Sequence, residues 1–369
     1  MRAHAANAFV QEQACRALFL ITFGTDAQGQ ARKQAAADTG ALPQIVAAMC
    51  AHAASAAIQE QACLALFNIT IGTDAQGQAR KQAAADAGAL PQIVAVMCAH
   101  PVNPAVQEQA CHALVNLAHG NDAQCDVHAQ AAADAGALAQ IVAAMCAHAI
   151  NPAVQEQACR ALNNLATSND AQGRARAQAA VDAGALPQIV AAMRAHAANA
   201  GLQEHACWVL INITVGTDAL SRARAQAAAD ADALPQIILA MRAHAAIADV
   251  QEYACRALRN IIFGDDARKQ VARGRAAPDR SGDARARGQR SRAGGGLPGA
   301  VPHHIRHRYA GLRAQADGSG RGGALRARRG DARARGQRSR AGAGVTNAGQ
   351  YCIRQRCTGL SAQAGGSGR

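Results

Sequence analysis

The sequence predicts an all-α protein: a right-handed α-solenoid followed by a disordered, arginine- and glycine-rich C-terminal tail. Two observations support this prediction. Half of the 369 residues are hydrophobic but only 2% are aromatic, and alanine is the main contributor, a composition that suits packed helices better than sheets. The second observation is an internal repeat of 48 residues that covers residues 1–270. Such repeats bury their apolar faces only against their neighbours.

Six units share one register. The string Gln-Glu-x-Ala-Cys recurs in every unit, and a methionine and a histidine keep the same step of 48 residues. The glutamines of this string are Gln11, Gln59, Gln107, Gln155, Gln203 and Gln251. Six copies in one register predict six structural units of the same fold within residues 1–270.

Each unit is divided into three helices, which we call first, second and third. The segment after Asp74 is polar and predicts a short first helix that ends near Gly88. The next segment, with Pro91 near its start, predicts a longer second helix. The third begins at the N-cap Asn103 and stops near Gly120. Its apolar face is predicted to be Val106, Ala110, Leu114 and Leu117. Two long helices and one short helix per unit favour a right-handed superhelix.

These residues resemble the armadillo repeat. Ala-Gly-Ala-Leu-Pro occurs at Ala87–Pro91 and Ala183–Pro187, and the string Ala-Leu-x-Asn followed by Ile or Leu occurs in four units. The period of 48 residues is longer than the usual ~40–47 of such repeats. Similar repeats occur in the armadillo region of leucine-rich-repeat kinases, which leaves open that the chain is a fragment of a larger protein.

The resemblance implies a binding groove. In armadillo arrays the third helices line a concave surface, and the asparagine of Ala-Leu-x-Asn holds the backbone of a bound peptide. An asparagine amide, with two donors and one acceptor, suits a peptide bond. Leu20 departs from this pattern, and any single asparagine has the alternative role of bracing its own loop. The matching positions are Asn68, Asn116, Asn164, Asn212 and Asn260.

Four residues earlier, the nuclear-import adaptors of this family carry tryptophans that clamp lysine side chains. Here only Trp208, paired with Asn212, reproduces that arrangement. Recognition of basic nuclear-localisation signals is therefore the runner-up. The other residues in these positions are Arg16, Leu64, His112, Arg160 and Arg256. The three arginines favour an acidic peptide, closer to the groove of the catenins.

No catalytic or metal-binding constellation emerges. One glutamate recurs per unit, from Glu12 to Glu252, so no acid/base pair converges. Cys50 and His52 resemble a ligand pair that recurs in two further units, but arginine replaces the cysteine later, and structural zinc needs four ligands. We expect these pairs to face solvent and the cysteine row from Cys15 to Cys255 to pack in the core. The expected protein is not an enzyme and has no cofactor, metal or small-molecule substrate.

Charge and cysteine usage indicate a location. Residues 1–270 hold 17 basic and 21 acidic side chains, whereas residues 271–369 hold 21 and 4. The chain lacks both an apolar run of ~18 residues and the pattern of a secretory signal. We therefore expect reduced thiols, a cytoplasmic or nuclear location and no membrane insertion.

The tail has the period of the array. GDARARGQRSRAG occurs at Gly282–Gly294 and again at Gly330–Gly342, 48 residues apart. Reading the codons of Arg273–Asp283 one base later permits the second-helix string AGALPQIVAAM. We interpret residues 271–369 as an out-of-frame continuation of two further units, caused by a deletion near Val271. The rival interpretation is a genuine tail that binds nucleic acid nonspecifically through its charge.

These inferences favour a non-enzymatic scaffold that binds an extended, acidic segment of a partner protein in its groove. The alternatives are a nuclear-import adaptor, a regulatory fragment of a multidomain kinase, and a protein that binds nucleic acid through its tail.

Restoring the reading frame near Val271 should lengthen the solenoid and raise its melting temperature, because each added unit brings a new interface. Thermal melts would compare the restored chain with a chain that ends before Val271. Equal melting temperatures would mean that residues 271–369 are a native tail.

Overall fold

The structure, a computed structural model, describes residues 1–120, 123–167 and 170–263. These residues belong to one unit, Met1–Ala277. They form sixteen α-helices and a 3-10 turn, Arg2–His4, and this part of the chain contains no strand. The all-α prediction is therefore confirmed. The expected tail, residues 271–369, lies outside the described residues.

The three helices of each unit recur in order. The first helices are α2 (Ala27–Asp38), α5 (Ala75–Asp86), α8 (Ala123–Asp134), α11 (Ala171–Asp182) and α14 (Ala219–Asp230). The second helices are α3 (Ala41–Ala51), α6 (Ala89–Ala99), α9 (Ala137–Ala147), α12 (Ala185–Ala195) and α15 (Ala233–Ala243). The third helices are α1 (Ala8–Ile21), α4 (Ala56–Thr70), α7 (Pro104–Leu117), α10 (Pro152–Ala166), α13 (Ala200–Thr214) and α16 (Ala248–Ile262).

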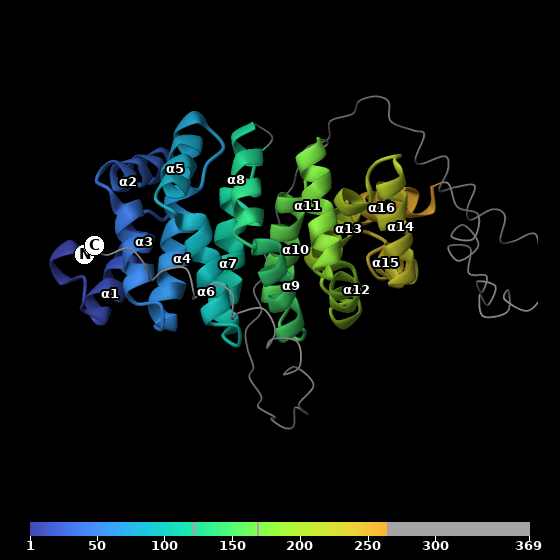
Figure 1. Ribbon diagram of the computed structural model, residues 1–369, viewed down its shortest axis with the longest axis horizontal. Helices are drawn as coiled ribbons and strands as arrows, with labels where there is room; N and C mark the ends of the chain where they lie inside the picture. Colours follow the sequence, from blue (N-terminus) through green and yellow to red (C-terminus); the bar gives the residue numbers. More distant parts are fainter. Residues whose placement is uncertain (121–122, 168–169, 264–369) are drawn as a thin grey trace, which may run out of the picture. The chain divides into compact units, whose positions relative to one another are not determined.

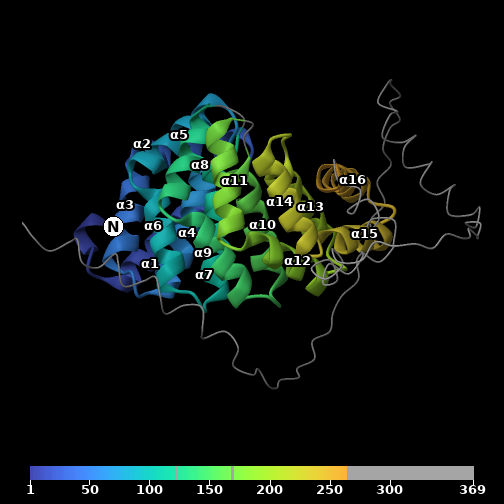
Figure 2. The ribbon, with the colours of Figure 1, turned by 45° about the vertical axis from the view of Figure 1, so that its right-hand side comes forward.

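Neighbouring repeats lie side by side in chain order (Figure 1). Each third helix packs against the third helices before and after it, and against the second helix that precedes it. The first helices α2, α5, α8 and α11 follow one another along one edge of the row (Figure 2). This regular stacking of neighbours confirms the predicted α-solenoid.

The expectation of a short first helix was wrong. The first helix α5 has 12 residues and the second helix α6 has 11. Capping at both ends explains the length, because the side chain of Asp74 accepts a hydrogen bond from Gly77 N at 2.8 Å and Gly88 ends the helix with a φ of 81°. In the fifth repeat Asp232 takes this left-handed conformation with a φ of 65°, as the one non-glycine residue with positive φ among the described residues.

Third helices begin where the sequence places their caps. The side chain of Asn103 accepts a hydrogen bond from Val106 N at 3.2 Å, and Pro104 is the first residue of α7. The helix ends at Leu117, three residues before the expected stop at Gly120. The predicted apolar face is buried in full. The core also contains five of the six cysteines of the predicted row, Cys15, Cys63, Cys111, Cys159 and Cys207, which are all inaccessible to solvent. The prediction was wrong for Cys255, which is only half-buried on α16.

A row of glutamines joins each third helix to the second helix before it. Gln107 Nε2 donates to Met97 O and to His100 O, both at 2.9 Å. These carbonyls belong to the last turn and the cap of α6, where the helix has no donors of its own. The equivalent glutamine makes the same pair of bonds in all six units.

A row of histidines joins one repeat to the next. His100 Nε2 is hydrogen-bonded to Ala53 O at 2.7 Å, 47 residues earlier in the chain. The same bond is formed by His52, His148, His196 and His244. The histidine of the repeat therefore serves the contact between units.

A third row, which the sequence analysis did not single out, caps the third helices. Arg80 on α5 is 1% exposed, and its Nε donates to Ile69 O at 2.7 Å. Arg176 and Arg224 bind the equivalent carbonyls of α10 and α13, and His128 takes this position in the third repeat. Cationic donors stabilise a helix C-terminus because they oppose its dipole.

No single described helix is long and apolar enough to cross a membrane. Among the described helices, the pair α8 and α9, counted together across a bend of 66°, meets the length and composition required.

Replacing Gln107 by Leu should lower the free energy of unfolding by roughly 2–3 kcal/mol, because two carbonyls at the end of α6 lose their donor. The matched control is Gln109→Leu, since Gln109 bonds only to Glu108 Oε1 at 3.3 Å and should cost less than ~0.5 kcal/mol. Urea unfolding followed by circular dichroism measures both. Equal losses in the two variants would contradict the structural role of the glutamine row.

Candidate functional site

Three side-chain rows share one side of the third helices, which we call the third-helix face. On α10 they are represented by Glu156, Arg160 and Asn164, spaced four residues apart and all half-buried. Residues at this spacing lie on the same side of a helix. Because the third helices stack in register, each row continues from one repeat to the next. The face contains all ten site residues that the sequence predicts.

Asparagine amides of this face bind the preceding repeat. Asn68 Nδ2 donates to Phe19 O at 3.0 Å, and Asn164 Nδ2 donates to Val115 O at 2.8 Å. Asn116, Asn212 and Asn260 make the equivalent bond at 3.4 Å, in each case to a residue 49 positions earlier. Asn116 and Asn212 also donate, at 2.6 Å, to the side-chain oxygens Thr70 Oγ1 and Asn163 Oδ1 of the preceding repeat. The partners thus belong to the neighbouring third helix rather than to the residue's own loop.

These bonds leave the side-chain oxygen of each asparagine without a hydrogen bond. Asn68 and Asn116 are 6% and 7% exposed, and the other three asparagines are half-buried. Within the described part of the chain, the Oδ1 atoms of the five asparagines accept no hydrogen bond. Each amide therefore has an acceptor for a ligand N–H, whereas its donor is engaged in the fold.

The three predicted arginines differ in their surroundings. Arg16 is exposed. Arg160 is half-buried, and its Nη1 donates to Gln157 Oε1 at 3.3 Å. Arg256 forms an ion pair with Glu252 at 3.4 Å and lies over the ring of Tyr253, 5.8 Å from its centroid. Arg16 is consequently the least engaged of the three cations.

Aromatic side chains on this face stack on one another. The rings of Trp208 and Tyr253 are parallel within 8°, with centroids 5.1 Å apart, so α13 and α16 are joined at their surface. His112 stacks on Phe67 with a centroid distance of 3.7 Å. Burial lowers the pKa of His112 from 6.5 to about 4, and Arg160 adds to this shift, so the ring is uncharged near neutral pH.

Sequence reasoning missed Tyr253 and Phe67. Tyr253 occupies the position of the repeat at which the first four units have glutamine and the fifth has His205. This change of residue type at one position of the repeat was the signal in the sequence that could have identified Tyr253. It marks the last two repeats as the aromatic end of the described face.

The glutamate row makes the face more acidic than the arginines suggest. Burial raises the pKa of Glu108, and the negative charge of Glu60 raises it further, although a hydrogen bond from Gln109 opposes both. Burial also raises the pKa of Glu204, with contributions from Asp249 and from the glutamate of the preceding repeat. Neighbouring repeats thus interact through like charges along this row.

The cysteine and histidine pairs do not form metal sites in the described residues, where no three ligand-type side chains gather. Cys50 is exposed, as expected, and its Sγ donates to Gln92 Oε1 at 3.1 Å. His52, in contrast, is half-buried and bonded to Ala5 O. The expectation that both members of each pair face solvent was therefore wrong for the histidine, because it ties two repeats together.

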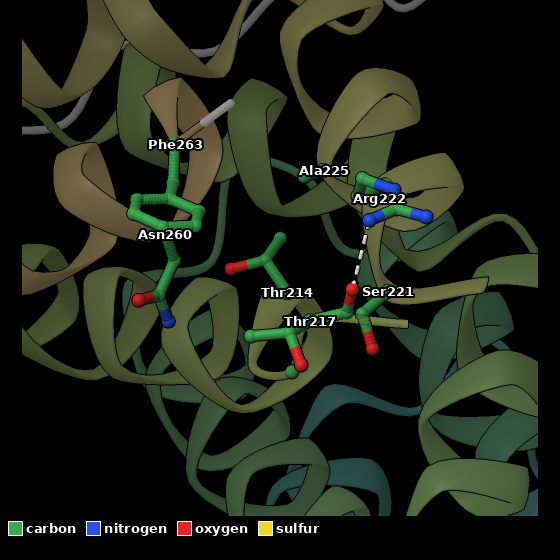
Figure 3. Close-up of a pocket in the computed structure, with 8 residues that line it drawn as sticks. Thr214, Thr217, Ser221, Arg222, Ala225, Asn260 and Phe263 are labelled. Atoms are coloured by element: carbon green, nitrogen blue, oxygen red, sulfur yellow. Dashed lines mark hydrogen bonds between the residues drawn. The ribbon is translucent and has the colours of Figure 1, made fainter. Parts of the chain in front are cut away.

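A cavity of about 150 Å³ lies between the loop before α14 and the end of α16 (Figure 3). Asn260 and Phe263 face Thr214 and Thr217 across it. In the second repeat Lys81 spans the equivalent space and donates to His119 O at 2.8 Å. Ala225 replaces that lysine here and leaves the space empty. The cavity borders Phe263, which is the last described residue.

A family model described as LRRK2 ARM repeat matches residues 1–186. No curated protein matches the chain.

Thiol reactivity should divide the cysteines into two classes. Burial raises the pKa of Cys63, Cys111 and Cys159 to about 12, so at pH 8 these thiols stay protonated as well as covered. Iodoacetamide should label the exposed Cys50 and Cys146 first, as read by peptide mass spectrometry. In denaturant, the buried and the exposed cysteines should react with iodoacetamide at similar rates. Rapid labelling of Cys111 in the native chain would contradict the core assignment.

Proposed function

Because this chain belongs to the LRRK2 ARM repeat family, we propose that it is a non-enzymatic scaffold whose third-helix face binds an extended segment of a partner protein. Armadillo repeats generally mediate contacts between proteins, which supports a protein partner. The observation that carries the proposal is the row of asparagine Oδ1 atoms, one per repeat, each available as an acceptor. An extended backbone presents N–H groups at regular intervals and satisfies such a row.

The arginines of the face set the expected preference for charge. Arg16 and Arg160 offer cationic groups beside the asparagine row, and we propose that they select acidic residues in the bound segment. Exposed ion pairs contribute only about 0–1 kcal/mol each. The backbone contacts therefore supply most of the affinity, and the arginines supply selectivity and faster association.

A basic segment is the second candidate. The glutamate row runs along the same face, and Glu252 already pairs with Arg256. A lysine or arginine side chain would relieve the like-charge repulsion along that row. This version corresponds to an adaptor for basic signals, with Trp208 as its one aromatic position.

Two wider proposals accompany the scaffold role. The family match is compatible with an armadillo part of a larger multidomain kinase, in which the repeats would present a partner to the rest of that protein. The cysteine usage supports a cytoplasmic or nuclear location, which fluorescence microscopy of a tagged chain can test.

Two substitutions separate backbone capture from charge selection. Asn164→Ala should weaken binding of every peptide about three- to tenfold, the range for loss of one hydrogen bond. Arg160→Glu should weaken the binding of acidic peptides up to about fivefold at low salt and leave the binding of neutral peptides unchanged. Binding of the full chain to a peptide array at two salt concentrations gives both values.

The matched control is Arg194→Glu, which makes the same charge change at an exposed position of α12. Thermal melts check each variant, because Asn164 also donates to Val115 O. Loss of binding in the control would show that net charge governs the interaction. Dominant binding of basic peptides to the unmodified chain would replace the acidic partner by the basic one.

A further inference from the structure

Two adjacent glutamates of the third-helix face lack the cation that follows this glutamate in other units. Four residues after the glutamate, the first, fourth and sixth units have arginine. In the sixth unit the two side chains form an ion pair at 3.4 Å. The second and third units have Leu64 and His112 at that position, after Glu60 and Glu108. The face is therefore short of positive charge across these two neighbouring repeats.

The two glutamates act on each other as like charges. Both side chains are half-buried, and their helices α4 and α7 pack directly together. Burial raises the pKa of Glu108 and the charge of Glu60 raises it further, against a hydrogen bond from Gln109. Neither carboxylate forms an ion pair with another described residue. His112 does not compensate, because a pKa of about 4 leaves its ring uncharged near neutral pH.

The fifth unit differs from this pair, although it also lacks the arginine. Trp208 stands four residues after Glu204. There the charge of Arg160, from the preceding repeat, opposes the rise in the pKa of Glu204. Arg160 also lowers the pKa of His112, so it borders the glutamate pair on one side. The charge that shifts the pKa of Glu108, in contrast, is that of another glutamate.

A second feature of the same two repeats points to a ligand. Asn68 and Asn116 are 6% and 7% exposed, and their Nδ2 atoms donate to the preceding repeat. Their Oδ1 atoms accept no hydrogen bond from a described residue, yet they remain open to solvent, unlike the buried Gln59 Oε1. Each asparagine follows its glutamate by eight residues, on the same side of the helix. Two fixed acceptors thus lie on the same strip of surface as the two carboxylates.

The surface between the carboxylates and these oxygens is largely apolar. Leu64 occupies it on α4, and on α7 the ring of His112 stacks on Phe67 with centroids 3.7 Å apart. Eight residues of helix rise about 12 Å, so a long side chain is needed to reach from one end toward the other. Arginine has the required groups, because its stem packs on apolar surface while its planar guanidinium binds carboxylates and stacks on rings.

We propose that the segment bound by the third-helix face carries an arginine whose guanidinium binds between Glu60 and Glu108. Its stem lies over Leu64 and the stacked rings, and main-chain N–H groups beside it donate to the two asparagine oxygens. Arg160 follows one repeat later, so the segment has an acidic residue on that side of the arginine. This inference rests on the proposed function and refines it, because the partner segment is then of mixed charge.

Binding of two matched peptides to the full chain tests the arginine site. Both are short, extended sequences of alternating serine and threonine, with either arginine or citrulline at the centre and a fluorescent label at one end. Citrulline keeps the shape of arginine without its charge. Fluorescence anisotropy at low salt should show roughly five- to thirtyfold tighter binding of the arginine peptide, the range for two half-buried ion pairs.

Three variants locate this preference. Glu60→Gln combined with Glu108→Gln removes both charges at nearly constant shape, so the two peptides should bind equally well. Leu64→Arg supplies the cation that the sixth unit has and should lower the preference severalfold. The matched control is Asp86→Asn with Asp134→Asn, which makes the same charge change at exposed ends of α5 and α8 and should keep the preference.

Thermal melts check that each variant is folded, and residues 271–369 are the same in all of them, so their charge cancels. Equal binding of the two peptides to the unmodified chain would overturn the arginine site, as would a preference that survives the double glutamate change or disappears equally in the control. In each of these cases binding of the citrulline peptide, weakened by Asn164→Ala, would leave the proposed function standing. Binding of neither peptide would overturn both.

Discussion

The array depends on one recurrent interaction: a side-chain donor that binds a main-chain carbonyl at the end of a helix. Every α-helix leaves its last carbonyls without internal partners, and a solenoid of short helices has many such ends. Glutamines serve the second helices, and buried arginines serve the third helices. Histidines and asparagines form the same kind of hydrogen bond with main-chain carbonyls of the preceding repeat. The apolar core supplies the bulk of the burial, while these donors fix how one unit is placed on the next.

This arrangement explains why the period of the sequence is so strict. A glutamine such as Gln107 reaches carbonyls seven and ten residues earlier, so an insertion between them would move the donor away from its acceptors. The histidine row spans 47 residues and the asparagine row 49. Each row therefore ties the length of one repeat to the geometry of the next. In the arginine row a different donor, His128, takes the place of arginine in one repeat and binds the equivalent carbonyl.

Much of the fold was predictable because it is encoded locally. Asn103 and Pro104 mark a helix start whatever the rest of the chain does, and the spacing of the cysteine row indicates a buried face. The roles of Arg80 and Asn164 were not predictable in this way. A residue type that recurs at the same position of each repeat shows that the equivalent residues share an environment, but it does not show which neighbour they contact. Arg80 lies in a polar segment, so its burial follows only from the carbonyls that the adjacent third helix presents. Trp208 and Tyr253 stack although they are 45 positions apart in sequence. The period of 48 residues does not predict this contact, because the two aromatic residues occupy different positions of the repeat and the other units have other residue types there.

Trp208 is the single tryptophan of the chain, and it stacks against Tyr253 at the last junction between third helices within the described residues. Its emission is therefore a built-in optical reporter for that junction alone. Circular dichroism, in contrast, averages over every helix. In a chain held together by contacts between nearest neighbours, the two signals separate when an end loosens before the middle. Fluorescence thus reports the detachment of α16, and the interval between the two transitions measures how strongly this last described helix is coupled to the preceding repeats.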